Sequence, residues 1–149
     1  MADRHRPSPV WVSWLSSVSL GVMAFGLALV LVPPLANTGF SLLLYADAGH
    51  IAAFGAPAVR YISLVHAVLG AVMFGWGALL FLLARGMFAR GERDAWRIIV
   101  ISLAAWFVPD TAFSLWSGFW QNAVLNFAFI VLFVVPLAAT YRVFHETRA

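Results

Sequence analysis

The chain has 149 residues, of which 63% are hydrophobic, and its mean hydropathy is +0.92. A soluble domain of this length cannot bury so much apolar surface, because small domains keep a large surface relative to their volume. The absence of cysteine excludes disulfides, thiolate metal sites and cysteine nucleophiles. The net charge is +3, but the basic residues apart from histidine are arginines at the ends of apolar runs, so we expect no nucleic-acid partner.

Four apolar segments are long enough to cross a bilayer, which takes about 20 helical residues. They predict an all-α fold, an antiparallel four-helix membrane bundle that forms a single transmembrane domain over residues 1–149. Ser8 suits a helix N-cap and Pro9 a first helical turn, whereas Pro33 and Pro34 end the first span. That span is too long for a signal peptide and no cleavage site follows it, so we expect an uncleaved anchor. The expected spans cover about 9–32, 61–84, 95–119 and 122–144.

The arginines predict the orientation of the bundle, because positively charged loops tend to stay on the cytoplasmic side. Only Arg60 falls in a loop on the opposite side. The other arginines flank the ends that would face the cytoplasm: Arg4, Arg6, Arg85, Arg90, Arg93, Arg97, Arg142 and Arg148. We therefore expect both termini to lie in the cytoplasm.

The link between the first and second spans, residues 35–59, is mostly apolar but too short to cross the membrane. Its part from Ser41 to Phe54 is expected to form an interfacial or re-entrant helix on the outer side, or a lid over the bundle. Asp47 and His50 are three residues apart, so one helical face could present both. Their simpler role is to form the solvated face of an interfacial helix.

Asp110 is the most informative residue of the chain, because it follows Pro109 inside an otherwise apolar span. A carboxylate at the centre of a membrane helix costs about 2.5–3.5 kcal/mol, so such a residue is usually buried against partners. The helical rise places Asp110 about 14 Å, His66 about 8 Å and Asn126 about 6–9 Å below the outer ends of their spans. We expect these side chains to meet in the outer half of the membrane.

Helical periodicity assigns an inward face to each span, and small residues on such a face let membrane helices approach closely. The expected inward stripes are Ser13, Ser17, Gly21, Ala24 and Ala28 on the first span; Ser63, His66, Gly70, Met73 and Gly77 on the second; Leu103, Trp106, Asp110, Ser114 and Ser117 on the third; and Asn122, Asn126, Phe129, Phe133, Pro136 and Thr140 on the fourth.

The polar residues allow functional and purely structural interpretations. Asp110 can be a proton acceptor, a cation ligand or a headgroup contact, or it can clamp two helices together. A neutral, protonated Asp110 is a further alternative, because burial disfavours the charged form. His66 can serve with Asp110 in general-base chemistry, or it can be a satisfied core histidine. A metal site built from Asp47, His50, His66 and Asp110 is a further alternative. Our expectation is that the chain holds no metal and no cofactor.

The remaining candidates come from the third and fourth spans. Asn122 and Asn126 are four residues apart and can bridge helices, although a helix cap at Asn122 and packing at Asn126 are simpler roles. Trp106 can line an apolar ligand pocket with nearby phenylalanines, or belong to the core. The candidate ligand-binding set is His66, Asp110, Ser114, Asn122, Asn126, Asp47, His50 and Trp106.

Two segments carry a resemblance to a known type of protein. They are H-A-V-L-G-A-V-M-F-G-W-G (66–77) and W-F-V-P-D-T-A-F-S-L-W-S-G-F-W-Q-N-A-V-L-N (106–126). They resemble a type of small bacterial inner-membrane protein, and in general plan the chain is similar to DoxX-like four-helix proteins. The resemblance covers helix count and topology. It implies a bacterial cytoplasmic-membrane protein and transfers no activity or site residue.

Together these features predict a membrane binding or accessory protein with an outer-leaflet polar pocket for a lipid-like or small amphipathic ligand, or for a partner helix. One alternative is a membrane enzyme that acts on a lipid or quinone-like substrate through a His66–Asp110 acid–base pair. The other is a small proton-coupled transporter subunit with Asp110 as the protonatable group. The expected partners are membrane lipids and either another membrane protein or further copies of this chain.

Overall fold

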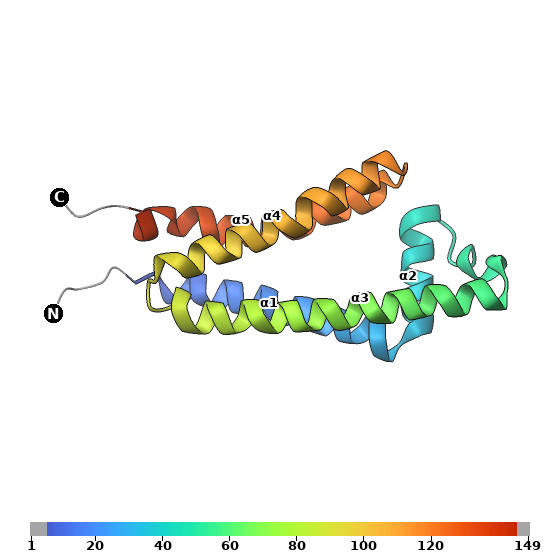
Figure 1. The fold of residues 1–149 in the computed structure, drawn as a ribbon, viewed down its shortest axis with the longest axis horizontal. Helices are drawn as coiled ribbons and strands as arrows, with labels where there is room; N and C mark the ends of the chain where they lie inside the picture. The colour runs from blue at the N-terminus through green and yellow to red at the C-terminus, as the bar shows by residue number, and fades with distance from the viewer. Residues whose placement is uncertain (1–5, 146–149) are drawn as a thin grey trace. The chain divides into compact units, whose positions relative to one another are not determined.

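The computed structural model describes residues 6–145 (Figure 1), and every regular element in that range is helical. The predicted all-α class is therefore confirmed. Arg4 and Arg148, on which part of the predicted orientation rests, lie outside the described residues. The elements in chain order are α1 (Pro9–Leu31), α2 (Pro33–Tyr45), the 3-10 helix η1 (Ile51–Phe54), α3 (Ala56–Leu83), the π-helical turn η2 (Ala84–Phe88), α4 (Arg93–Trp116) and α5 (Trp120–His145).

Four helical stretches are long enough and apolar enough to cross a membrane: Pro9–Leu31, Ala56–Phe88, Arg93–Trp116 and Trp120–His145. Large apolar side chains remain exposed along α3, among them Leu64, Val68 and Val72. Lipid, unlike water, solvates such side chains without cost, so their exposure fits helices that lie in a bilayer. These features indicate a multi-pass membrane protein.

Several helix boundaries differ from the sequence prediction. Pro33 and Pro34 do end α1, but they also occupy the first positions of α2, where a missing backbone N–H costs nothing. The long helix in this link therefore begins at Pro33 and ends at Tyr45, earlier than the predicted segment from Ser41 to Phe54. The next span is longer than predicted, since α3 begins at Ala56.

The third span is shorter than predicted. α4 ends at Trp116, because Gly118 adopts a left-handed φ of 85° that terminates the helix. The backbone N–H of Ser117 still donates to the carbonyl of Phe113 at 2.8 Å, which closes the last turn. α5 then begins at Trp120, so the connection between the two helices is a tight turn.

The chain divides into two compact units. One contains Met1–Leu20 and Leu79–Ala149, and the other contains Gly21–Ala78. α1 and α3 each contribute to both units, since the divisions fall within these helices. The prediction of a single domain stays a prediction.

In the unit of residues 21–78, α1 and α3 touch through two glycines. A Cβ atom added at Gly26 would lie 2.5 Å from the carbonyl oxygen of Gly70 and 2.8 Å from the backbone nitrogen of Phe74. A Cβ atom added at Gly70 would in turn collide with the carbonyl oxygen of Gly26 and with Leu29. Backbones that approach this closely leave no room for a side chain on either helix, which is how small residues promote packing in membranes.

The inward stripe predicted for the first span is wrong. Its members are mostly exposed: Ser13, Ser17, Gly21 and Ala24. The buried face of α1 instead carries Leu15, Ser19, Val22, Gly26 and Leu29. Serine is an ambiguous marker of an inward face, because its hydroxyl can bond to its own helix. In the second span, His66, Gly70 and Gly77 are buried as predicted.

In the other unit, α4 and α5 run side by side in opposite directions (Figure 1). Pro136 lies inside α5 and has no backbone N–H to donate to the carbonyl of Leu132, one turn earlier. The indole Nε1 of Trp14 in α1 donates to that carbonyl at 2.9 Å. A tryptophan of one helix therefore replaces the hydrogen bond that a proline removes from another.

We expect Gly70→Ala to lower the melting temperature of the purified protein in detergent, because forced repacking typically costs about 1–3 kcal/mol. The matched control is Gly75→Ala on the same helix, where an added Cβ meets nothing within 4 Å. The control should be neutral or slightly stabilising, since alanine is the better helix former. Equal melting temperatures for the two variants would contradict the close contact between α1 and α3.

We also expect Trp14 and Pro136 to be energetically coupled. Trp14→Phe should destabilise the protein by about 0.5–1.5 kcal/mol, the net worth of one hydrogen bond. The same change should cost much less in a Pro136→Ala background, where residue 136 can itself donate to Leu132. Thermal unfolding of the two single variants and the double variant measures this coupling. Strictly additive effects would show that the indole does not replace the missing backbone bond.

Candidate functional site

Asp110 lies in α4, six residues before the helix ends at Trp116. Six residues correspond to about 9 Å along a helix, so Asp110 is nearer the end of its helix than the predicted 14 Å. The difference arises because Gly118 stops the helix early. α4 continues through Pro109 without a break, and the Asp110 side chain is partly buried.

The carboxylate of Asp110 is held by neutral donors from α4 and α5. The side-chain amide Nδ2 of Asn122 donates to Asp110 Oδ1 at 3.0 Å and to Ser114 Oγ at 2.8 Å. The Ser114 hydroxyl donates to the backbone carbonyl of Asp110 at 2.7 Å, with a longer contact of 3.3 Å to Oδ1. The structure thus brings together three of the predicted site residues, Asp110, Ser114 and Asn122. We call these three residues the Asp110 cluster.

The donors in the Asp110 cluster fix the orientation of the Asn122 amide. An ionised carboxylate only accepts hydrogen bonds, and the Ser114 hydroxyl has already given its proton to a carbonyl. Both partners of Asn122 therefore need an N–H, so its NH₂ group faces them and its Oδ1 points away. The predicted role of Asn122 as a helix cap is wrong, because α5 begins two residues earlier at Trp120.

Asn126 and Trp106 lie near this cluster in sequence but have their own partners. Asn126 is 3% exposed, and its Nδ2 donates to Thr111 Oγ1 at 3.3 Å. Thr111 was not among the predicted residues, although its position beside Asp110 was the available signal. Trp106 is half-buried and makes an edge contact with Phe107, with ring centroids 6.3 Å apart.

His66 belongs to a second polar cluster, in the unit of residues 21–78. Its Nδ1 lies 3.0 Å from Oδ1 of Asn37 in α2, and its ring stacks on Phe40 with centroids 4.5 Å apart. Asn37 Nδ2 donates to Ser63 Oγ at 2.8 Å, and the Ser63 hydroxyl donates to the carbonyl of Val59 at 2.9 Å. We call His66, Asn37 and Ser63 the His66 cluster.

The sequence analysis did not predict Asn37, because the link was expected to be mostly apolar and only Asp47 and His50 were considered as its polar candidates. A signal was present, since Asn37 and Ser41 are four residues apart in a segment with few other polar groups. α2 brings Asn37 onto α3, where it becomes the partner of His66.

The hydrogen bonds of the His66 cluster run in one direction and fix the imidazole tautomer. Ser63 gives its proton to Val59, so it accepts from the amide nitrogen of Asn37. The amide oxygen of Asn37 must then face His66, which requires a proton on Nδ1. In the neutral ring Nε2 is therefore the unprotonated acceptor.

The two clusters lie in different units of the chain. The hydrogen bonds join Asp110 to Ser114 and Asn122, and they join His66 to Asn37. The predicted meeting of His66 with Asp110 and Asn126 stays a prediction.

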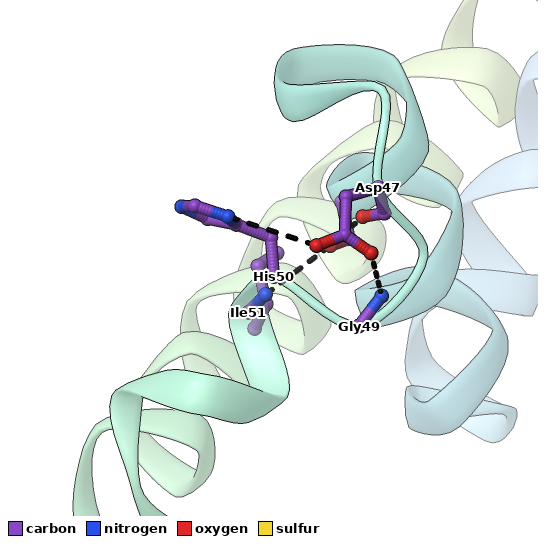
Figure 2. Close-up of polar contacts among 5 residues, drawn as sticks. Asp47, Gly49, His50 and Ile51 are labelled. Carbon is purple, nitrogen blue, oxygen red and sulfur yellow. Dashed lines mark hydrogen bonds and ion pairs between the residues drawn. The ribbon is translucent and has the colours of Figure 1, made fainter.

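Asp47 and His50 form a third polar group, in the turn between α2 and η1 (Figure 2). The Asp47 carboxylate accepts from the backbone N–H of Gly49 at 2.9 Å and lies 3.9 Å from His50 Nδ1. The His50 ring stacks on Tyr45, with centroids 4.0 Å apart, and meets the ring of Phe54 edge-on. These local contacts explain the positions of Asp47 and His50, which both belong to this turn.

The metal alternative finds no support in the structure. Among residues 6–145 there is no group of three or more His, Cys, Asp or Glu side chains that could hold a metal ion. Asp110 also takes part in none of the ion pairs of that range, which are His50–Asp47, Arg90–Glu92 and Arg97–Asp94. Its carboxylate is held only by neutral groups.

Comparison of the chain with protein-family models, with curated proteins and with solved structures finds no match.

Proposed function

We propose that this protein is a membrane binding or accessory protein, in which the Asp110 cluster receives the polar end of a lipid-like or small amphipathic ligand. A polar segment of a partner helix, from another membrane protein or a second copy of the chain, is the other occupant that this chemistry admits. Four apolar helical stretches of spanning length support a location in a membrane. The arginine distribution and the resemblance to DoxX-like proteins favour the bacterial inner membrane.

The proposal rests on the location of the Asp110 carboxylate and on the kind of partners it has. It lies in a helix of spanning length, accepts a hydrogen bond from the Asn122 amide and has no ion pair among residues 6–145. A carboxylate in a membrane helix is costly, and such residues usually serve a ligand, an ion or a proton. A structural clamp between α4 and α5 could be made by neutral amides and hydroxyls alone, as Asn126 and Thr111 show.

The expected depth of the cluster suits an amphipathic ligand. By the arginine distribution, the turn between α4 and α5 faces the extracytoplasmic side. The tryptophans on either side of that turn, Trp116 and Trp120, are largely exposed, as interfacial anchors are. Asp110 would then lie about 9 Å below the interface, within reach of a polar head whose chain extends into the lipid.

We expect mass spectrometry of lipids extracted from the purified protein to show one amphiphile enriched over its share of the host membrane. Asp110→Asn should abolish this enrichment, because it removes the charge while keeping the size of the side chain. The matched control is Asp94→Asn, which changes a carboxylate that is 75% exposed in the first turn of α4. The control should bind as the parent protein does.

Two results would contradict a ligand-binding role for Asp110. One is a lipid profile in bulk proportions for the parent protein. The other is a large loss of thermal stability in Asp110→Asn without any change in bound lipid, which would identify the carboxylate as a structural clamp. A proton-coupled transporter subunit would instead show pH-dependent flux in liposomes.

The fixed tautomer of His66 favours one specific form of the enzyme alternative. Because Nδ1 already donates to Asn37, the nitrogen that can take a proton is Nε2. An amide therefore orients the ring through Nδ1, in the position that a carboxylate would occupy in a His–Asp pair. In such an enzyme, we infer that His66 Nε2 accepts a proton from the substrate.

This alternative predicts that neutral His66 carries its proton on Nδ1. Nitrogen-15 NMR of histidine-labelled protein in detergent distinguishes the two tautomers, and the His66→Gln variant assigns the signal. Asn37→Leu should abolish the preference for Nδ1–H, since it removes the acceptor. A proton on Nε2 in the parent protein would show that the Asn37 amide is oriented the other way.

A further inference from the structure

When Asp110 is ionised, its cluster has a negative charge that no ion pair among residues 6–145 balances. The arginines of its own unit lie far along the helices: Arg97 precedes Asp110 by 13 residues of α4, about 20 Å of helix. A carboxylate in a spanning helix is far more stable with a cation beside it. A ligand that supplies a positive charge would therefore be favoured.

In the same cluster all the side-chain hydrogen-bond donors are engaged, whereas some acceptor oxygens are not. Both N–H groups of the Asn122 amide face inward, to Asp110 and Ser114, and the Ser114 hydroxyl is bound to its own helix. The hydrogen bonds engage Asp110 Oδ1, while Oδ2 and Asn122 Oδ1 receive none among the described residues. What the cluster offers a ligand is therefore oxygen acceptors, and a matching ligand must bring donors.

A hard metal ion could balance the negative charge of an ionised Asp110, but the cluster offers it too few oxygen ligands. Calcium takes six to eight oxygen ligands, often from several carboxylates, and Asp110 belongs to no group of metal-ligating side chains in residues 6–145. An ammonium group needs fewer contacts, because its N–H bonds can be shared between two or three oxygens. Charge-assisted N–H bonds of this kind are about twice as strong as neutral ones.

We propose that the Asp110 cluster binds a primary ammonium group, with Asp110 Oδ2 accepting its N–H bond. This inference rests on the proposed binding function and names the chemistry of its ligand. The ammonium group comes either from an aminophospholipid headgroup or from a soluble amine. The Asn122 amide has a positioning role as well, since its NH₂ group holds Asp110 Oδ1 and so orients the carboxylate.

The test compares amphiphiles that share a dodecyl chain but differ in the head, added to the full-length protein in a non-ionic detergent. Dodecylammonium has charge and N–H donors, dodecyltrimethylammonium has charge alone, and N-dodecylacetamide has a neutral N–H. We expect dodecylammonium to bind at least about tenfold more tightly than either of the others, as measured by the shift in melting temperature over a titration. Asp110→Asn should abolish this preference, and Asp94→Asn should keep it.

Two further arms identify the source of the amine. Nanodiscs of phosphatidylcholine with and without phosphatidylethanolamine test the headgroup, and free ethanolamine tests a soluble amine. Asp110-dependent stabilisation by either one supports the proposal, and stabilisation by neither overturns it. Equal binding of the trimethylammonium compound would also overturn it, because charge alone would then suffice.

The proposal and the broader binding function can fail separately. If N-dodecylacetamide binds best and Asp110→Asn abolishes that binding, the ammonium assignment is wrong while the ligand-binding role stands. If no amphiphile binds in an Asp110-dependent way and no lipid is enriched on purification, both are wrong. A variant that unfolds is replaced by Asn122→Leu, which removes the positioning amide but keeps the carboxylate. This variant should weaken dodecylammonium binding at least about tenfold.

Discussion

Hydrocarbon offers no hydrogen-bond partner, and this constraint organises the polar groups of the protein. Every donor or acceptor that enters the membrane must be satisfied within the chain or by a ligand. Serines and threonines meet this need locally, as Ser19 does by donating to the carbonyl of Leu15 at 2.7 Å. Where Pro136 removes a backbone donor, the indole of Trp14 reaches across from another helix to the carbonyl of Leu132.

The same constraint explains why the two polar clusters differ in what they offer. In the His66 cluster the donors form a directed chain that ends on a backbone carbonyl, and the imidazole keeps one accepting nitrogen. In the Asp110 cluster the Asn122 amide donates to one carboxylate oxygen and to Ser114, and the carboxyl group has only neutral partners. The first arrangement suits proton acceptance, and the second suits recognition of a donor that carries positive charge.

Small residues contribute in a complementary way. The reciprocal contact of Gly26 and Gly70 brings two backbones together where side chains cannot fit. Close backbone contact can replace hydrophobic driving force between helices, because lipid tails are as apolar as leucine side chains. It also holds α1 against α3 in the same unit in which α2 places Asn37 on His66.

The amino-acid sequence by itself determined the all-helical class and the four spanning stretches, because length and hydropathy are local properties. It also placed Asp110 and Ser114 on one helix face, one turn apart, where the structure brings them into contact. It did not determine which face of α1 is buried, since a serine can satisfy its hydroxyl on its own helix and face lipid. The bonds of Asn122 to Asp110 and of Asn37 to His66 were decided by tertiary structure alone. They depend on where Gly118 stops α4 and on how α2 turns at Pro33, and hydropathy and periodicity specify neither.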